Sequence, residues 1–466
     1  MIGAILFGSF LVLLLLGVPV AFALGVAACC ALVAMGGFGE LSIVPSVFTA
    51  SVSSETLLAI PFFILAGVIM EYAGISRRLV DFAQACVGRR KHGLAIVVVV
   101  AAFFFSAISG SGPATVAAIG SILIPALIRQ GYRPRHATSL LATAGSMGII
   151  VPPSVAFIIF AVVVSDYEGV SIVRLFVAGI VPGILLAVAL MIASLFLPRT
   201  TAEQPVAVGG GAASGGASES EVGDADEDRP RGGVTEQPDE PHRPAMKRLA
   251  ATFGGAIPGL LVPLIILGGI YGGIVTPTES AVVAAAYALL VGLFVYREIA
   301  VRQLYRILVT AAAQSAVVML IVGAASVFAY VVTANQIAET VSDLLLGLTG
   351  SPVLIVLLAV IVLLVVGAFI DAVSALYLFV PIIAPVLLEA GVDVTTIGVM
   401  MVVNLALGLV TPPVGVNLFV AAGIAKVPLL EVVKGIRPFF FAGLAVVLLV
   451  AYVPALSNWL PDLLGF

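Results

Sequence analysis

The sequence predicts an all-α polytopic membrane protein made of two inverted repeats, each with a re-entrant helical hairpin and a broken helix. Three observations predict this fold class: the composition, an internal repeat, and the distribution of Lys and Arg. Of the 466 residues, 61% are hydrophobic and only 10% are charged, which excludes a water-soluble globular domain. A membrane-spanning helix needs roughly 20 mostly apolar residues, and the chain contains many such runs.

A polar segment divides the chain into two parts. Residues 200–245 are rich in Gly, Ser, Pro, Asp and Glu, and such a composition cannot bury enough apolar surface to fold. We therefore expect a first repeat at 1–199, a disordered acidic cytoplasmic linker at 200–245, and a second repeat at 246–466. Each repeat has room for about five membrane helices and one hairpin. An inert tether is the simplest interpretation of the linker, and a regulatory element is the alternative.

The two parts repeat each other at an offset of 260 residues. The segment MGIIVPPSVAFIIFA at 147–161 aligns without gaps to LGLVTPPVGVNLFVA at 407–421. At the same offset, the second Pro and the Gly of PIIAPVLLEAGV align with the Pro and Gly of SILIPALIRQGY. A Gly-x-x-x-Pro-Pro core inside a longer apolar match indicates a duplication of about half the chain.

Lys and Arg, which mark cytoplasmic loops, are distributed unequally between the repeats. In the first repeat they lie on both sides of the apolar runs 93–109 and 112–128: Arg77, Arg78, Arg89, Arg90, Lys91, Arg129, Arg133 and Arg135. The SGSGP turn between these runs therefore predicts an inward-opening re-entrant hairpin near 94–130. The matching flanks of the second repeat contain Asp and Glu but no Lys or Arg. We expect its hairpin, near 353–390, to open outward, so the repeats are inverted.

Four places have irregular backbone within apolar sequence, which a membrane tolerates only where it faces protein, water or an ion. They are the hairpin tips SAISGSGPAT and GAFIDAVSA and the two Pro-Pro segments. Consecutive prolines cannot donate helical hydrogen bonds, so Val151 before Pro152 and Thr411 before Pro412 should leave the helix. Freed carbonyls with Ser and Thr hydroxyls suit a hard cation such as Na⁺, and half-helix N-termini suit an anionic substrate. Simple kinks in packed helices are the alternative.

Three polar residues inside apolar stretches are candidates for function. Asp371 is an acid that falls opposite Ser111 in the repeat, and intramembrane acids face a cavity or a partner rather than lipid. We interpret Asp371 as an ion ligand or proton carrier, with a structural acceptor as the alternative. Interhelical hydrogen bonding is the simplest interpretation of Asn404 and Asn417, but Asn417 lies just past a break and is a candidate substrate contact.

Inverted repeats with discontinuous helices are the architecture in which secondary transporters place their sites near the membrane midplane. An intramembrane enzyme would instead show paired Asp, a metal cluster or a Ser-His arrangement, whereas His92, His136 and His242 are expected in polar loops. The SGSGPAT tip lacks the Lys of a phosphate loop, so no ATPase is indicated, and we expect no nucleic-acid partner. A pure scaffold subunit gains nothing from four symmetric interruptions.

With these residues in view, the chain resembles the large membrane subunit, the DctM-type permease, of tripartite ATP-independent periplasmic (TRAP) transporters. The resemblance rests on IPFFILAGVIMEYAGIS, SAISGSGPATVAAIGSILIPAL, AGSMGIIVPPS and VVNLALGLVTPPVGVNLFVA. It implies an ion-transporter superfamily fold of the elevator type in the bacterial inner membrane. It also implies sodium-driven uptake of small organic acids, a separate small four-helix membrane subunit and a periplasmic substrate-binding protein. A stand-alone ion-coupled carboxylate carrier that needs no binding protein is the alternative.

The resemblance also assigns roles to residues at the tips and breaks. The sodium ligands it implies are Ser109, Ser111, Gly148, Val151, Asp371, Ser374, Gly408 and Thr411. The substrate contacts we expect are Ser111, Gly112, Ser154 and Asn417, and the residues expected to interrupt the helices are Pro113, Pro152, Pro153, Pro412 and Pro413. The chain departs from the family pattern at Ile149, Ala156 and Ser121, and these departures bear on the substrate class more than on the mechanism.

Overall fold

The computed structural model describes residues 1–87, 93–198, 245–348 and 351–466. These residues form helices and no strand, so the all-α prediction is confirmed. The expected linker lies outside the described residues except for its last residue, Ala245, which begins a helix. Three of the cations expected to mark the cytoplasmic side, Arg89, Arg90 and Lys91, also lie outside the described part of the chain.

The helices follow the two repeats. Those of the first repeat are α1 (Ile2–Leu15), α2 (Val20–Gly36), η1 (Phe38–Ser42), α3 (Ile43–Val52), η2 (Glu55–Leu58), α4 (Ala59–Tyr72), α5 (Ile75–Val87), α6 (Gly93–Ser109), α7 (Gly112–Arg129), α8 (Pro134–Gly145), η3 (Ser146–Ile149), α9 (Val155–Val164) and α10 (Ile172–Leu195). Those of the second are α11 (Ala245–Tyr271), α12 (Pro277–Leu290), η4 (Val291–Val295), α13 (Val301–Ala334), α14 (Ile337–Leu348), α15 (Pro352–Gly367), α16 (Ala372–Glu389), α17 (Val394–Gly408), α18 (Val416–Ala425), α19 (Leu429–Gly435), α20 (Arg437–Tyr452) and α21 (Ala455–Leu464).

Many of these helices can cross a membrane. Seven described helices are long and apolar enough to span one, and counting two bent pairs as single spans gives up to nine. The bent pairs are α18 with α19, at 113°, and α20 with α21, at 62°. Because a spanning helix satisfies its own backbone hydrogen bonds, a chain with this many apolar helices is a multi-pass membrane protein.

The offset found in the sequence recurs in the backbone. Helices α7 and α16 begin at Gly112 and Ala372 and end at Arg129 and Glu389, so both boundaries are 260 residues apart. Each ends at a turn with a positive-φ glycine, Gly131 at +86° and Gly391 at +83°, a conformation that favours glycine. Helices α8 and α17 begin at the same offset, and each is followed by a cis Pro-Pro bond, Pro152–Pro153 in one repeat and Pro412–Pro413 in the other.

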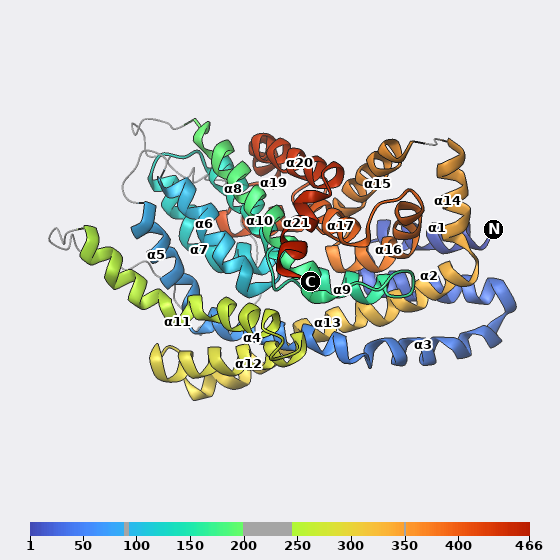
Figure 1. Ribbon diagram of the computed structural model, residues 1–466, viewed down its shortest axis with the longest axis horizontal. Helices are drawn as coiled ribbons and strands as arrows, with labels where there is room; N and C mark the ends of the chain where they lie inside the picture. Colours follow the sequence, from blue (N-terminus) through green and yellow to red (C-terminus); the bar gives the residue numbers. More distant parts are fainter. Residues whose placement is uncertain (88–92, 199–244, 349–350) are drawn as a thin grey trace, which may run out of the picture.

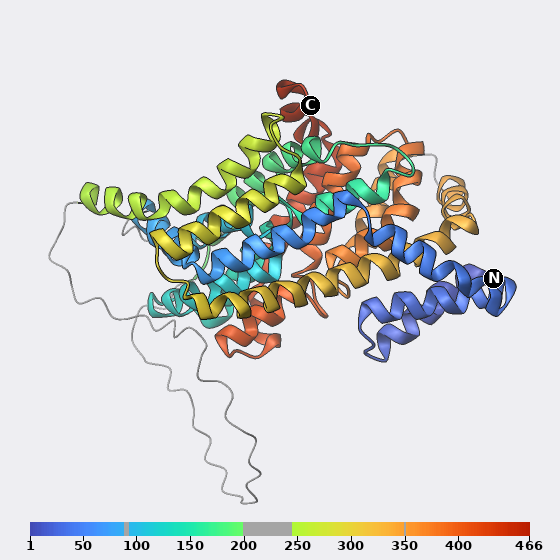
Figure 2. The same ribbon diagram turned by 90° about the horizontal axis from the view of Figure 1, so that it is seen from below.

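The helices form two packed groups (Figure 1). In one group, which we call the scaffold, α13 packs on α2, α3 and α4, and α12 packs on α4 and α11. Figure 2 shows α4, α12 and α13 side by side along the molecule. The other group, the hairpin unit, contains the hairpins α6–α7 and α15–α16, the broken helices α8–α9 and α17–α18, and α10, α20 and α21. Helices α5 and α14 connect the scaffold to the two hairpins.

A polar network joins the two repeats within the hairpin unit. Arg174 of α10 donates to Thr395 Oγ1 at 2.9 Å and to Asn458 Oδ1 at 3.2 Å, and it pairs with Asp462 at 2.7 Å. Asn458 in turn donates to Thr396 Oγ1 at 3.1 Å. The ion pair is partly exposed and contributes little alone. Together these bonds fix α21 against α10 of one repeat and α17 of the other.

Candidate functional site

The tip of the first hairpin is a two-residue connection between α6 and α7. Gly110 has a φ of +60°, and Ser111 follows in an extended conformation as the N-cap of α7. Ser109 Oγ lies 2.7 Å from Thr115 Oγ1, and Thr115 Oγ1 donates to the Ser111 carbonyl at 2.9 Å. Ser109 and Thr115 are both buried. The tip therefore gathers hydroxyl and carbonyl oxygens, the ligand type that hard cations prefer.

The first break packs directly on this tip. A Cβ atom at Gly148 would lie 2.4 Å from the Ser111 carbonyl oxygen, so only glycine fits there without moving backbone. Pro153 has no N–H to donate to the Ile149 carbonyl, and the Ser154 hydroxyl donates to that carbonyl instead, at 2.5 Å. The Gly148 carbonyl accepts no hydrogen bond from the described residues, so this oxygen of the break has no intramolecular partner among them.

Asp371 caps α16 at the tip of the second hairpin. Its Oδ2 accepts from the Ser374 backbone N–H at 3.1 Å, and its Oδ1 accepts from the Ser374 hydroxyl at 2.6 Å. Asp is a preferred N-cap residue. A structural hydrogen-bond acceptor, the alternative given for Asp371 from the sequence, is therefore one of its roles. The side chain is half-buried, and an ionised carboxylate has about four lone-pair sites. The cap therefore leaves Asp371 with acceptor capacity for a cation.

The second break packs on the second tip through backbone. The N–H groups of Val414 and Gly415 both donate to the Ala368 carbonyl at 3.2 Å. A Cβ atom at Gly408 would lie 2.6 Å from Gly367 Cα, so here too two backbone segments of the protein are in direct contact at a glycine. The Thr411 hydroxyl donates to the carbonyl one turn earlier, at 2.8 Å, a local bond typical of Thr in helices.

Asn417 links the second break to the first repeat. Its Nδ2 donates to the Ala142 carbonyl at 3.2 Å and to Ser146 Oγ at 3.4 Å. Its side chain is fully buried, and its Oδ1 has no hydrogen-bond partner among the described residues. A Cβ atom at Gly112 would lie 3.1 Å from both amide atoms of Asn417. An unsatisfied carboxamide oxygen therefore lies beside the N-terminus of α7, between the repeats.

The structure brings some of the expected residues together and separates others. Of the expected ligands in the first repeat, Ser109, Ser111 and Gly148 meet at one tip. In the second repeat Asp371 contacts Ser374, whereas Gly408 meets the tip through Gly367. The Ser154 hydroxyl donates to a carbonyl of its own break. Asn404 donates to the Val360 carbonyl at 2.8 Å, which is the interhelical hydrogen bond expected for it.

Two contributors were missed by the sequence interpretation, and one expectation was wrong. Thr115 completes the hydroxyl cluster, and its position four residues after Ser111, one helical turn, is the signal that could have found it. Ser146 meets Asn417 only through tertiary packing. His136 lies in the first turn of α8 and is buried, not in a polar loop, because α8 begins at Pro134, two residues before it. His92 and His242 lie outside the described residues.

The two breaks differ in exposure. Val151, Pro152 and Pro153 are buried, whereas Pro412 and Pro413 are exposed. The half-helices that follow differ in the same way. Nearly all of α9 is buried against α16, α10, α17 and η2, whereas Phe419 on α18 is 51% exposed. Two segments of matching sequence therefore have different environments in this structure.

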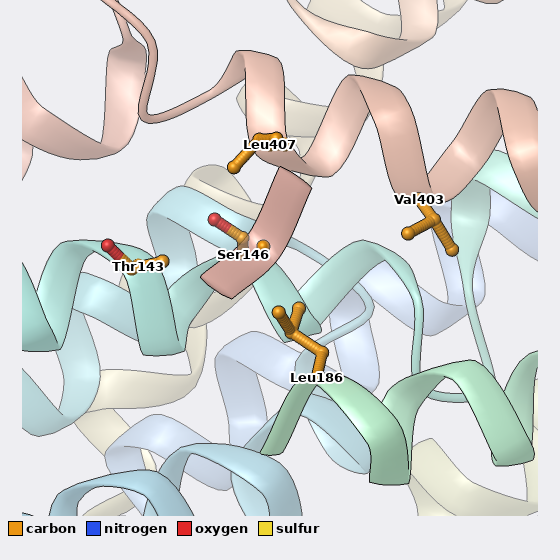
Figure 3. Close-up of a pocket in the computed structure, with 6 residues that line it drawn as sticks. Thr143, Ser146, Leu186, Val403 and Leu407 are labelled. Atoms are coloured by element: carbon orange, nitrogen blue, oxygen red, sulfur yellow. The ribbon is translucent and has the colours of Figure 1, made fainter. Parts of the chain in front are cut away.

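One cavity beside the first break is small. Figure 3 shows Thr143 and Ser146 beside Leu186, Val403 and Leu407, around a cavity of about 10 Å³ between the repeats. A single water needs at least roughly 10–15 Å³, so no organic acid fits in this cavity. A larger space of about 710 Å³ lies in the scaffold between α2, η1, α3 and α13. Its lining is almost wholly apolar, as in Phe22, Val26 and Phe48, so it does not suit an acid either.

Comparisons with known proteins identify relatives over the whole chain. Residues 7–456 match the model of the "Tripartite ATP-independent periplasmic transporter, DctM component". The isethionate TRAP transporter permease protein DctMQ of Oleidesulfovibrio alaskensis is 39% identical over 452 residues, which are 97% of this chain and 65% of that protein. The chain thus spans just under two thirds of this relative. The C4-dicarboxylate TRAP transporter large permease protein DctM of Pseudomonas aeruginosa is 38% identical over 410 residues, 88% of this chain and 87% of that protein.

One solved structure has the same fold at low sequence identity. The YdaH transporter of Alcanivorax borkumensis superposes with a TM-score of 0.56 over 98% of both chains at 16% identity. At this identity the likeness concerns the fold alone, and it agrees with the architecture of hairpins and broken helices described above.

Proposed function

The chain belongs to the DctM component family of the tripartite ATP-independent periplasmic transporters, and from this membership we propose that it is the large membrane subunit of a sodium-coupled importer of small organic acids. It is a multi-pass transporter subunit of the bacterial inner membrane and not an enzyme. The observation that carries the proposal is the packing of each hairpin tip on the Pro-Pro break of its own repeat.

We propose that Na⁺ binds at each of these two contacts. In the first repeat, the hydroxyl of Ser109, the carbonyl of Ser111 and the unpartnered carbonyl of Gly148 supply neutral oxygens, with Val151 at the adjoining turn. In the second repeat, Asp371 supplies a charged oxygen. Oxygen-only ligand sets of this kind suit hard cations. A charged site and a neutral site would hold sodium with different affinities.

We propose that the substrate anion binds where the repeats meet, at Ser111, Gly112 and Asn417. The Gly112 N–H opens α7, where amides have no intrahelical partner and attract anions, and Nδ2 of the buried Asn417, the amide atom that can donate to an anion, lies beside it. Ser154 belongs to the first break, which packs on the tip at Ser111. The relatives are named for C4-dicarboxylates and isethionate, which are anions, so a small organic acid is the substrate class we expect.

The difference in exposure between the breaks supports alternating access by an elevator movement of the hairpin unit along the scaffold. By the distribution of Lys and Arg, α18 leads from the second break toward the cytoplasm and α9 leads from the first break toward the periplasm. The partly exposed α18 and the buried α9 then describe an inward-facing state. The opposite state would bury α18 and expose α9.

We propose two protein partners, a separate small four-helix membrane subunit and a periplasmic substrate-binding protein. Their support is membership in a tripartite family. The alternative is a stand-alone carboxylate carrier that needs no binding protein. Whether uptake depends on added binding protein distinguishes the two.

The test is uptake of a labelled C4-dicarboxylate into proteoliposomes that contain the chain and the small subunit. We expect uptake only with an inward sodium gradient and with the binding protein added outside. Uptake with a proton gradient alone would refute sodium coupling. Uptake that is unchanged when the binding protein is omitted would favour the stand-alone carrier.

A further inference from the structure

The scaffold helix α13 is longer than a membrane span requires. Its 34 residues extend about 50 Å at 1.5 Å per residue, whereas the hydrocarbon core of a bilayer is about 30 Å thick. The first turns of α13 therefore lie at or beyond a membrane surface. Arg297 precedes the helix and Arg302 lies in its first turn, so the positive-inside rule assigns this end to the cytoplasm.

These two arginines are exposed and have no partner among the described residues. Glu298 is the only acid between residues 280 and 338, and it is already paired. Its carboxylate lies 2.7 Å from Arg78 of α5, and the Arg78 guanidinium stacks 3.7 Å above the Tyr296 ring. The field around Arg297 and Arg302 is therefore positive, and the N-terminal end of the α13 dipole adds to it.

Exposed apolar residues flank the two cations in the chain. Phe294 and Val295 of η4 are 68% and 60% exposed, and Val301 and Tyr305 of α13 are 76% and 78% exposed. Tyr side chains favour the level of lipid headgroups, and arginines near the cytoplasmic surface attract anionic lipids. A surface with cations among apolar groups fits a ligand that has both an anionic head and apolar chains. A free anion would use only the cations.

We propose that Arg297 and Arg302, with the apolar side chains of η4 and the start of α13, bind an anionic phospholipid of the cytoplasmic leaflet. The headgroup phosphate lies between the two guanidinium groups, and the acyl chains lie along Phe294 and Val301. The Arg78–Glu298 pair engages the carboxylate that directly follows Arg297 in the chain. The lipid thus holds the scaffold at a fixed depth in the membrane, whichever solute the hairpin unit carries.

The experiment is native mass spectrometry of the full-length chain in detergent, titrated with phosphatidylglycerol and, separately, with phosphatidylcholine. We expect the wild type to bind phosphatidylglycerol more tightly. Each arginine near a membrane surface contributes about 1 kcal/mol, or roughly fivefold in affinity. The double substitution Arg297→Gln/Arg302→Gln should therefore weaken phosphatidylglycerol binding roughly 30-fold, and Arg302→Gln alone roughly fivefold.

The matched control is Lys434→Gln, because the Lys434 ammonium is paired with Glu431 at 2.7 Å on another part of the surface. It should leave phosphatidylglycerol binding unchanged. Equal binding of phosphatidylglycerol by the wild type and the double variant would overturn the proposal. Displacement of the lipid by inorganic phosphate at the same concentration would also overturn it, because the site would then bind free anions. Loss of the lipid when the small membrane subunit is added would overturn it as well, because the surface would then be a protein interface.

Discussion

Removing the charge of Asp371 tests the proposed sodium site most directly. Asn is as good an N-cap as Asp, and its amide oxygen can accept from the Ser374 N–H as the carboxylate does at 3.1 Å. Asp371→Asn therefore preserves the start of α16 and removes only the negative charge. Any change in sodium dependence then reports on the charge and not on the fold.

The expected size of the effect follows from the position of the carboxylate. Two unit charges 4 Å apart interact by about 4 kcal/mol at an effective dielectric constant of about 20. Asp371 is half-buried, so solvent screens part of this interaction and we expect about 2 kcal/mol to be lost. This loss corresponds to a roughly 30-fold increase in the sodium concentration that gives half-maximal uptake.

The assay is uptake into proteoliposomes across a sodium titration, with the binding protein and the small subunit supplied. Asp393→Asn is the matched control, because Asp393 caps α17 through the same kind of bond, to the Thr396 N–H at 2.9 Å, but lies away from the hairpin tip. Ser121→Ala, on the exposed face of α7, is a second control. Wild-type sodium dependence in Asp371→Asn, or an equal loss in Asp393→Asn, would refute the assignment.

Two further predictions follow from the contacts at the tips and breaks, and a third follows from the distribution of Lys and Arg. Gly148→Ala should lower uptake roughly tenfold, because overpacking costs about 1–3 kcal/mol. The control Gly268→Ala, at a glycine that faces open space, should leave uptake unchanged. A larger loss of uptake in Gly268→Ala than in Gly148→Ala would contradict the tip contact. Asn417→Ala should raise the KM for the acid roughly tenfold, the cost of a lost hydrogen bond to a charged group, without moving the sodium midpoint; a shifted sodium midpoint alone would place Asn417 in the ion site. A cysteine in place of Ser218, outside the described residues, should react with an impermeant reagent only in opened spheroplasts, and labelling of intact ones would reverse the orientation.

The fold class could be predicted because it depends on regular features of the sequence. Apolar runs define the helices, and the shared Gly-x-x-x-Pro-Pro core defines the repeat. The Pro-Pro segments also locate the backbone breaks, since proline removes a donor wherever it stands. Such local rules could not reveal which groups satisfy the freed carbonyls. The Ile149 carbonyl accepts from Ser154, whereas the equivalent Leu409 carbonyl accepts from the Asn417 N–H at 3.0 Å.

The candidate site was less predictable because its contacts are tertiary. The sequence pairs Ser111 with Asp371 by offset, yet the two breaks meet their tips through different atoms: Gly148 lies against Ser111, but Gly408 lies against Gly367. The contact between Asn417 and Ser146 joins residues that are 271 apart in the chain. No pattern in a single sequence encodes such a pairing. The difference in burial between the two breaks is likewise a property of one conformational state.

The bonds between the repeats have a consequence for the order of events during synthesis. Ser139 of α8 donates to the Val432 carbonyl at 2.7 Å, Ala142 accepts from Asn417, and Arg174 pairs with Asp462. Each of these partners leaves the ribosome almost 300 residues later, which at about 5–20 residues per second is roughly 15–60 s. During that time Ser139 and Ala142 of α8 and Arg174 of α10 have not yet met these partners. The contacts between the repeats can therefore form only after nearly the whole chain has been made.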